Sequence, residues 1–279
     1  MNSFNEHSPS SWQVSIIHFL QFHQFHPKLL VQCGIFPGNT LVLIIFRGLV
    51  FLYLFLMFIL GLIYADWKNA IKYYSDVQFF FVAFYFLSTL ILSVRFRYSI
   101  GRQSRYNSEE TLSANHFELF LWVLFEMVAI NAYFLDVVYW FLLHEPPVGI
   151  YAIGAHILNV VLITVELFLN KLEVSIPHII FTFLCGFLYV LFAWFWYGVT
   201  GDWVYYFLDW STQTAAISYF MLVIFGVMFF FLVKGFVTLR NQLIDFLERS
   251  KTFEELKEWE QGSGFNQDAM EEEDDEFLT

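Results

Sequence analysis

Charged residues are scarce in this chain of 279 residues: Asp, Glu, Lys and Arg make up only 14%, whereas hydrophobic residues make up 58%. A soluble domain carries about 25% charged residues, so this composition is typical of a polytopic membrane protein. Cysteine is rarer still, and because only Cys33 and Cys185 are present, a disulfide framework is not expected. The net charge of −12 describes mainly the C-terminal end, where most of the excess Asp and Glu lies.

The signatures of several enzyme classes are missing as well. The sequence contains neither a Gly-x-Ser-x-Gly turn nor a phosphate-binding loop. His18, His23 and His26 form the only histidine cluster, which falls short of the several histidine boxes that a membrane di-iron enzyme needs. The basic residues of segment 95–105 are expected to set topology or to contact anionic lipid. We therefore predict no metal ion, no organic cofactor and no nucleic-acid partner.

Long apolar runs dominate what is present. A helix that crosses a bilayer needs about 20 predominantly apolar residues, and a backbone in lipid must satisfy its own hydrogen bonds. Six runs meet this length: Leu41–Tyr64, Tyr74–Val94, Phe117–Leu143, Gly149–Leu169, Ile176–Gly198 and Thr214–Leu239. The sequence therefore predicts an all-α fold, a six-helix transmembrane bundle.

Basic residues are distributed unequally between the two ends of this predicted bundle. Lys68 and Lys72 are the only basic residues at one end, and all other Lys and Arg lie at the opposite end. Because the basic end faces the cytosol, both termini are predicted to be cytosolic. The membrane is expected to be that of the endoplasmic reticulum or the plasma membrane.

Three regions follow from this topology. Residues 1–40 are predicted to form a cytosolic arm, in which Ser11–Phe25 has the composition of an interfacial amphipathic helix. Residues 41–239 form the transmembrane domain. Residues 240–279 form a cytosolic helix that continues into an acidic, disordered tail.

One histidine lies inside an apolar run. An ionisable side chain at membrane depth is costly unless it faces protein or water, so His156 marks a candidate functional site. It lies roughly 10 Å below the non-cytosolic end of its helix, and Ser75 begins the second run at the same end. Since a serine becomes a good nucleophile only when a nearby base takes its proton, Ser75 and His156 form a candidate catalytic pair. The alternative is structural: an interhelical contact for His156 and a helix cap for Ser75.

The group that would orient His156 is less clear from the sequence. Asn159 lies one turn further along the same helix face, and Asp136 and Asp209 belong to the same end of the bundle. Glu166 is too far along the helix for direct contact, so we expect it to join a polar cluster or to pair with Lys171.

Two further sets of polar residues have expected roles. Glu126 lies in the middle of its run and is expected to make a hydrogen-bonded contact between helices. Thr200, Trp203 and Tyr205 follow the fifth run, and we expect them to shape the mouth of the site or to donate to an oxyanion.

The last third of these runs resembles a known family. The stretch from His156 to Glu166, the tripeptide Ile176-Pro177-His178, Tyr189, and the segment Val199-Thr-Gly-Asp-Trp-Val-Tyr-Tyr-Phe-Leu-Asp-Trp210 carry the likeness. They resemble the membrane superfamily that joins the androgen-induced and androgen-dependent TFPI-regulating proteins to the rolling stone proteins.

The resemblance implies a fold, an activity and two residues. Androgen-induced members are six-helix membrane hydrolases that cleave fatty acid esters of hydroxy fatty acids with a threonine and a histidine. Their histidine falls on His156, and their threonine, preceded by Lys-Phe-Leu, falls on Ser75, which follows Lys72-Tyr73-Tyr74. Serine in place of threonine keeps the hydroxyl and loses a methyl group. The rolling stone branch is instead associated with myoblast fusion and has no established reaction.

Two functions follow as hypotheses. In the first, the chain is an intramembrane hydrolase of lipid esters in which Ser75 attacks and His156 is the base, with Asn159 or Asp209 orienting the histidine and Tyr205 in support. Its partners would be the lipid bilayer and an acyl-lipid substrate. In the second, it is a non-catalytic multi-pass protein that acts in adhesion, fusion or a larger complex. A transporter is disfavoured, because no internal repeat or broken helix is visible.

Overall fold

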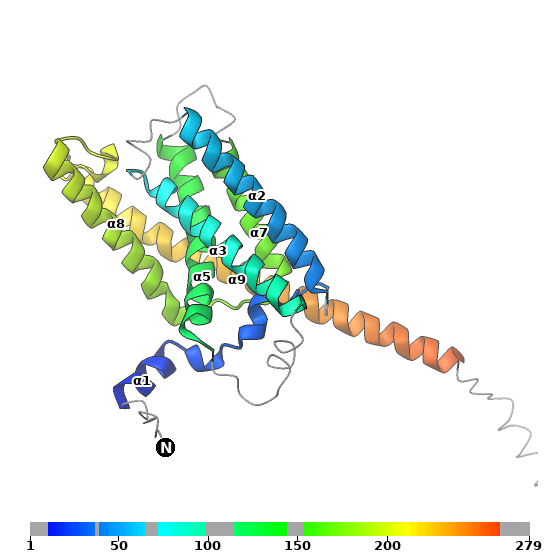
Figure 1. Cartoon of the computed structure of the whole chain (residues 1–279). Coiled ribbons are helices and arrows are strands. Elements are labelled where there is room, and N and C mark those ends of the chain that lie inside the picture. Colours follow the sequence, from blue (N-terminus) through cyan, green and yellow to red (C-terminus); the bar gives the residue numbers. More distant parts are fainter. Residues whose placement is uncertain (1–10, 37–38, 65–71, 99–113, 144–152, 263–279) are drawn as a thin grey trace, which may run out of the picture. The chain divides into compact units, whose positions relative to one another are not determined.

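The computed structural model describes residues 11–36, 39–64, 72–98, 114–143 and 153–262, and every regular element in these ranges is helical (Figure 1). The long helices are α2 (Thr40–Tyr64), α3 (Tyr74–Tyr98), α5 (His116–Val138), α7 (Asn159–Leu169), α8 (Ile179–Thr200) and α9 (Ala215–Gly262), and the shorter α1 (Ser11–Phe19) precedes them. The remaining elements are single turns: η1 (Phe22–Gln24), η2 (Pro27–Leu30), η4 (Tyr139–Leu143), η5 (Ile153–Leu158), η6 (Ile176–His178) and η7 (Tyr206–Leu208). The all-α prediction is confirmed for these residues.

Five helical stretches are long and apolar enough to cross a bilayer. They are Thr40–Ile63, Tyr74–Tyr98, His116–Leu143, Ile176–Thr200 and Ala215–Thr252, and they correspond to five of the six predicted runs. The fourth predicted run gives a shorter apolar helix, His156–Leu169, and its first residues, 149–152, lie outside the described residues. The chain is thus a multi-pass protein by length and composition. The sixth crossing and the cytosolic termini stay predictions.

The contacts between Cα atoms divide the chain into two units, Met1–Val237 and Thr238–Thr279. The first unit contains α1 to α8 and the first part of α9. The described part of the second unit is the continuation of α9 to Gly262. The predicted acidic tail, residues 263–279, lies outside the described residues.

Helix α5 forms the centre of the first unit. In the most apolar part of the α5–η4 stretch 72% of the residues are buried, compared with 11% in α8 with its preceding turn. Helix α5 packs against α3, α7 and α8, and α2 packs against α3 and α7. The start of α5 is fixed by a capping box, in which the side chains of Asn115 and Glu118 each accept a hydrogen bond from the other residue's backbone N–H. The site described below is built on this central helix.

A fully buried ion pair joins α2 to α7. Arg47 Nη2 lies 2.6 Å from Glu166 Oε1, and both side chains are 0% exposed. Arg47 Nη1 also donates to Ser93 Oγ, and Glu166 Oε1 also accepts a hydrogen bond from the Tyr85 hydroxyl. The expectation that Glu166 belongs to a polar cluster is confirmed, but its cationic partner is Arg47 rather than Lys171. A buried charge is tolerated where pairing and hydrogen bonds offset its desolvation, as they do here.

A second buried pair joins α5 to the start of α8. Glu126 Oε1 lies 3.0 Å from His178 Nδ1 and accepts a hydrogen bond from Ser175 N–H. The other ring nitrogen, His178 Nε2, lies 2.8 Å from the carbonyl oxygen of Leu20. The interhelical contact predicted for Glu126 is therefore confirmed, and the pair also holds the segment that follows α1. Helix α1 itself ends at Phe19, short of the predicted Phe25, because Gln21 adopts a left-handed conformation with φ of 58°.

Candidate functional site

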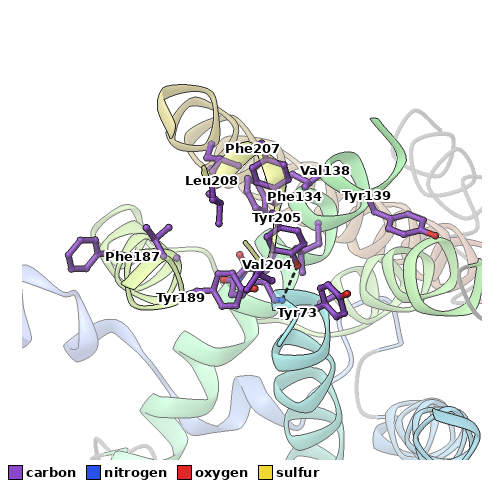
Figure 2. A pocket seen from close by; sticks show the side chains of 18 of the residues that line it. Tyr73, Phe134, Val138, Tyr139, Phe187, Tyr189, Val204, Tyr205, Phe207 and Leu208 are labelled. Carbon is purple, nitrogen blue, oxygen red and sulfur yellow. Dashed lines mark hydrogen bonds between the residues drawn. The ribbon is translucent and has the colours of Figure 1, made fainter. Parts of the chain in front are cut away.

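A cavity of about 890 Å³ lies between the first turn of α3, the second half of α5, α8, the start of α9 and the loop that joins α8 to α9. This volume falls in the range of small-molecule binding sites, roughly 300–1,000 Å³. Figure 2 shows aromatic side chains from these elements gathered around it, among them Phe134, Tyr189 and Tyr205. Most of the lining is apolar. The cavity therefore suits a ligand that is largely hydrocarbon.

The cavity brings together the two residues predicted as a catalytic pair. Ser75 in the first turn of α3 and His156 in η5 both line it. Asp76 lines it too and interacts electrostatically with His156. Among the described residues no hydrogen bond joins Ser75 to His156, so the two side chains share a cavity without being bonded to each other. Their chemistry would require the two groups to approach when a ligand binds.

His156 is held by contacts on two sides of its ring. Its Nδ1 lies 3.6 Å from Asp136 Oδ1, and both side chains are largely buried. Its ring stacks on Tyr139, with centroids 3.7 Å apart and planes 8° from parallel. Asp136 is in the last turn of α5 and Tyr139 begins η4, so the end of α5 fixes the histidine. With Nδ1 facing a carboxylate, Nε2 is the nitrogen left to take a proton from the cavity.

The turns that carry these residues are unusual in their geometry. Both η4 and η5 are π-helical, and π-helical turns occur frequently at functional sites. Gly154 lies in η5 close to α2, where its carbonyl oxygen accepts a hydrogen bond of 2.9 Å from the Tyr53 hydroxyl. A Cβ atom at Gly154 would lie 2.9 Å from Tyr53 Oη and from Met57 Cε. Glycine therefore allows the close approach of α2 to the turn that holds His156.

Tyr205 covers the site from the loop between α8 and α9. Its hydroxyl oxygen accepts a hydrogen bond of 3.0 Å from the backbone N–H of Tyr74, next to Ser75. The residue is 9% exposed and lines the cavity. Burial raises the pKa of the Tyr205 phenol to about 12, so the hydroxyl is protonated at neutral pH and can donate a hydrogen bond to a bound ligand.

The other predicted residues do not line the cavity. Among the described residues Asn159 makes no hydrogen bond to His156, and Asp209 Oδ1 accepts hydrogen bonds from its own turn, from Ser211 N–H and Oγ. Thr200 Oγ1 donates to the carbonyl oxygen of Trp196 at the end of α8. Trp203 stacks on Tyr197. The carboxylate that meets His156 is Asp136, which the sequence offered as one of several alternatives.

Two polar residues of the cavity were missed in the sequence. Asn131 on α5 and Thr182 on α8 are 4% and 7% exposed and line the cavity. Each is a single uncharged residue within an apolar run, and such residues are common in membrane helices. The signal in the sequence that could have indicated Asn131 is that it belongs to the same apolar run as Asp136, a little over one turn before it.

Metal-binding side chains and similar proteins give no further indication of what this site does. No cluster of three His, Cys, Asp or Glu side chains suited to a metal ion occurs in the described ranges. No family model matches the chain, and neither a curated protein nor a solved structure is significantly similar to it. The likeness to the androgen-induced and rolling stone superfamily is therefore a resemblance of motifs alone.

Proposed function

We propose that the chain is an intramembrane hydrolase of lipid esters in which Ser75 is the nucleophile and His156 the general base. The observation that carries the proposal is that Ser75 and His156 line one largely apolar cavity while Asp136 lies 3.6 Å from His156 Nδ1. A serine, a histidine and a carboxylate in this order are the groups that acyl transfer requires, and they recur on unrelated folds. An apolar cavity in a membrane helix bundle favours an acyl lipid as the substrate.

The reaction follows from these positions. Ser75 Oγ attacks the acyl carbon of the ester while its proton passes to His156 Nε2. The carboxylate of Asp136 stabilises the resulting imidazolium and keeps the ring oriented. His156 then gives the proton to the leaving alcohol oxygen, which leaves an acyl group on Ser75. Water, deprotonated by the same histidine, hydrolyses this acyl-enzyme and releases the fatty acid.

The negative charge that develops on the carbonyl oxygen needs a donor. Tyr205 is the candidate, because its hydroxyl accepts from Tyr74 N–H and is protonated at neutral pH. A donor that is fixed in place before the reaction stabilises an oxyanion without the cost of reorganising solvent. Tyr205 thus keeps its predicted supporting role as the oxyanion donor, and Asp136 takes the orienting role that was predicted for Asn159 or Asp209.

The missing hydrogen bond between Ser75 and His156 fits an enzyme without its substrate. Catalytic hydrogen bonds are often long or poorly aligned in the free enzyme and tighten in the complex. We also propose the finer topology: six crossings, both termini in the cytosol, and the cavity in the non-cytosolic leaflet of the endoplasmic reticulum or plasma membrane.

A non-catalytic role is the second candidate, and one observation favours it. His156 is paired with Asp136 and stacked on Tyr139, as a structural interhelical histidine would be. In that case the chain would act in adhesion, in fusion or as a subunit of a complex, and Ser75 would have no reactivity.

Hydrolysis by the purified full chain distinguishes the two candidates. Fatty acid esters of hydroxy fatty acids are offered in detergent micelles, and the released fatty acid is measured. We expect hydrolysis to be lost in Ser75→Ala and in His156→Ala and kept in Ser88→Ala, which removes a buried hydroxyl of the same helix that does not line the cavity. Hydrolysis that survives in Ser75→Ala would refute the nucleophile, and an inactive but well-folded wild-type chain would favour the non-catalytic role.

A further inference from the structure

The cavity extends along the helices beyond the reactive residues. Helices α5 and α8 run in the same direction (Figure 1), and the Glu126–His178 contact joins the middle of α5 to the turn before α8. On α5, Asn131 precedes Asp136 by a little over one turn, about 7.5 Å along the axis. On this helix the cavity therefore reaches well below the level of His156.

Helix α8 shows the same depth. The Tyr189 hydroxyl donates to the carbonyl oxygen of Lys72, which places Tyr189 at the level of Ser75. Thr182 precedes Tyr189 by two turns, about 10 Å along the axis. We call the part of the cavity lined by Ile130, Asn131, Thr182, Phe183 and Gly226 the deep end. A Cβ atom at Gly226 would lie 3.2 Å from Phe183 Cε1, so α8 and α9 pack closely at this point.

The deep end contains polar atoms without hydrogen-bond partners. Asn131 Nδ2 and Thr182 Oγ1 are both buried and make no hydrogen bond among the described residues. The Tyr74 hydroxyl interacts with the Asn131 side chain and donates to Cys185 Sγ at 3.5 Å, but the geometry between it and Asn131 Nδ2 does not reach that of a hydrogen bond. A buried polar group without a partner is rare in a native structure and calls for a ligand or an ordered water.

We infer that Asn131 and Thr182 bind an uncharged oxygen carried by the hydrocarbon chain of the ligand. Asn131 Nδ2 can only donate, and the Thr182 hydroxyl can donate as well, so a carbonyl or ether oxygen is an acceptor that suits either group. The oxygen is uncharged because no charged side chain lines the deep end, where an unpaired carboxylate would be strongly disfavoured.

The depth of the cavity sets the position of this oxygen. The deep end lies about 7.5–10 Å from the level of the reactive residues. An extended chain advances roughly 3.5 Å for every three bonds, which is about 1.2 Å per bond. The chain carbon that carries the oxygen would therefore lie about six to eight bonds from the ester carbonyl carbon. The inference rests on the proposed function only for the position of the ester at Ser75.

Binding without turnover tests the inference. Full-length protein with Ser75→Ala is titrated with isomeric methyl oxo-octadecanoates, which displace a pyrene-labelled methyl ester. Isomers that differ only in the position of the oxo group partition equally into micelles, so affinity reports the protein contact. We expect isomers with the oxo group near carbons 7–9 to bind roughly three- to tenfold more tightly than the 15-oxo isomer, the gain expected from one net hydrogen bond.

Variants of similar shape locate the contact. In the same background Asn131→Leu and Thr182→Val should reduce this preference, and the two together should abolish it. Thr164→Val is the matched control, because Thr164 Oγ1 already bonds the carbonyl oxygen of Val160 and does not line the cavity. Equal affinity for all isomers, a preference that persists in the double variant, or no binding of any ester would each overturn the inference. If the variant binds the isomers with this preference but the wild-type chain does not hydrolyse esters, the inference about the deep end stands. Only the proposed hydrolase activity is then refuted.

Discussion

Two polar clusters inside the helical body of the chain differ in how completely their hydrogen bonds are satisfied. Around Arg47 and Glu166 both charges are paired, and Tyr85 and Ser93 add further hydrogen bonds. Around the cavity, Ser75 and His156 are not bonded to each other, and Asn131 and Thr182 have unpaired atoms. A saturated cluster, in which the hydrogen bonds are satisfied, offers few groups to a ligand and stabilises the fold. An unsaturated cluster beside an open volume can bind and react.

The largest expected effect is on folding, at the saturated cluster. Arg47→Met leaves the Glu166 carboxylate buried without its partner, which should lower the free energy of unfolding by about 3–5 kcal/mol. Thermal unfolding in detergent, followed by size-exclusion chromatography, measures the loss. Ser75→Ala should change stability by less than about 0.5 kcal/mol, because it removes no described hydrogen bond. If the two variants were equally destabilised, the distinction between the clusters would fail.

The next largest effect is on catalysis, at Asp136. Asp136→Asn keeps the shape of the side chain but removes the charge that faces His156 Nδ1. We expect kcat for ester hydrolysis to fall roughly 10²- to 10⁴-fold, as it does when the carboxylate of a catalytic triad is neutralised. Asp209→Asn is the control, since Asp209 Oδ1 accepts hydrogen bonds from Ser211 and makes no described contact with His156, and its rate should stay close to wild type. A larger loss in Asp209→Asn than in Asp136→Asn would assign the orienting role to the loop instead.

A smaller loss of rate is expected at Tyr205. Tyr205→Phe removes the hydroxyl that would donate to the oxyanion, and one such donor contributes about 10²-fold to kcat. KM should change little, since the donor acts in the transition state. Tyr206→Phe removes the hydroxyl of the neighbouring exposed tyrosine, which bonds Leu142 O instead, and should have no such effect. A rise in KM at unchanged kcat would mean that Tyr205 only shapes the cavity.

The smallest of these effects concerns the position of His156. Gly154→Ala forces either both Tyr53 and Met57 or the turn η5 to move, because the new Cβ would lie 2.9 Å from Tyr53 Oη and from Met57 Cε. A displacement of less than about 1 Å in η5 should lower kcat roughly tenfold, given that 1 Å can cost about 10²-fold. Gly48→Ala on α2 meets no atom within 4 Å and serves as the matched control. Equal rates in both variants would show that the close approach of α2 does not position the histidine.

The helical fold could be predicted because it depends on properties that are local in the sequence. Twenty or more apolar residues in a row have one stable form in lipid, so five runs appear as long helices that begin within a few residues of their predicted starts. The last of them continues beyond Leu239 to Gly262. The fourth run was harder. Its described part begins with the π-helical turn η5, which carries His156 and continues directly into α7. Apolar periodicity does not distinguish one π-helical turn from an α-helical one.

The site could be predicted only in part, because partners depend on how helices rotate against one another. Depth along two helices indicated that Ser75 and His156 share a level, and the structure places both in one cavity. The depth of a residue along its helix does not show how that helix is rotated about its axis. The sequence could therefore not choose Asp136 over Asn159 as the residue that contacts His156. For Glu166 it offered a polar cluster or a pair with Lys171, and packing supplies a cluster whose cation is Arg47 from another helix.

The central claim is that the Ser75 hydroxyl is a nucleophile, and the covalent adduct tests it most directly. The purified chain is treated with an alkyl fluorophosphonate of medium chain length, digested, and analysed by tandem mass spectrometry to locate the phosphonyl group. We predict one adduct, on Ser75, that disappears in His156→Ala. An adduct on another residue, or a fully folded chain that acquires none, would contradict the account.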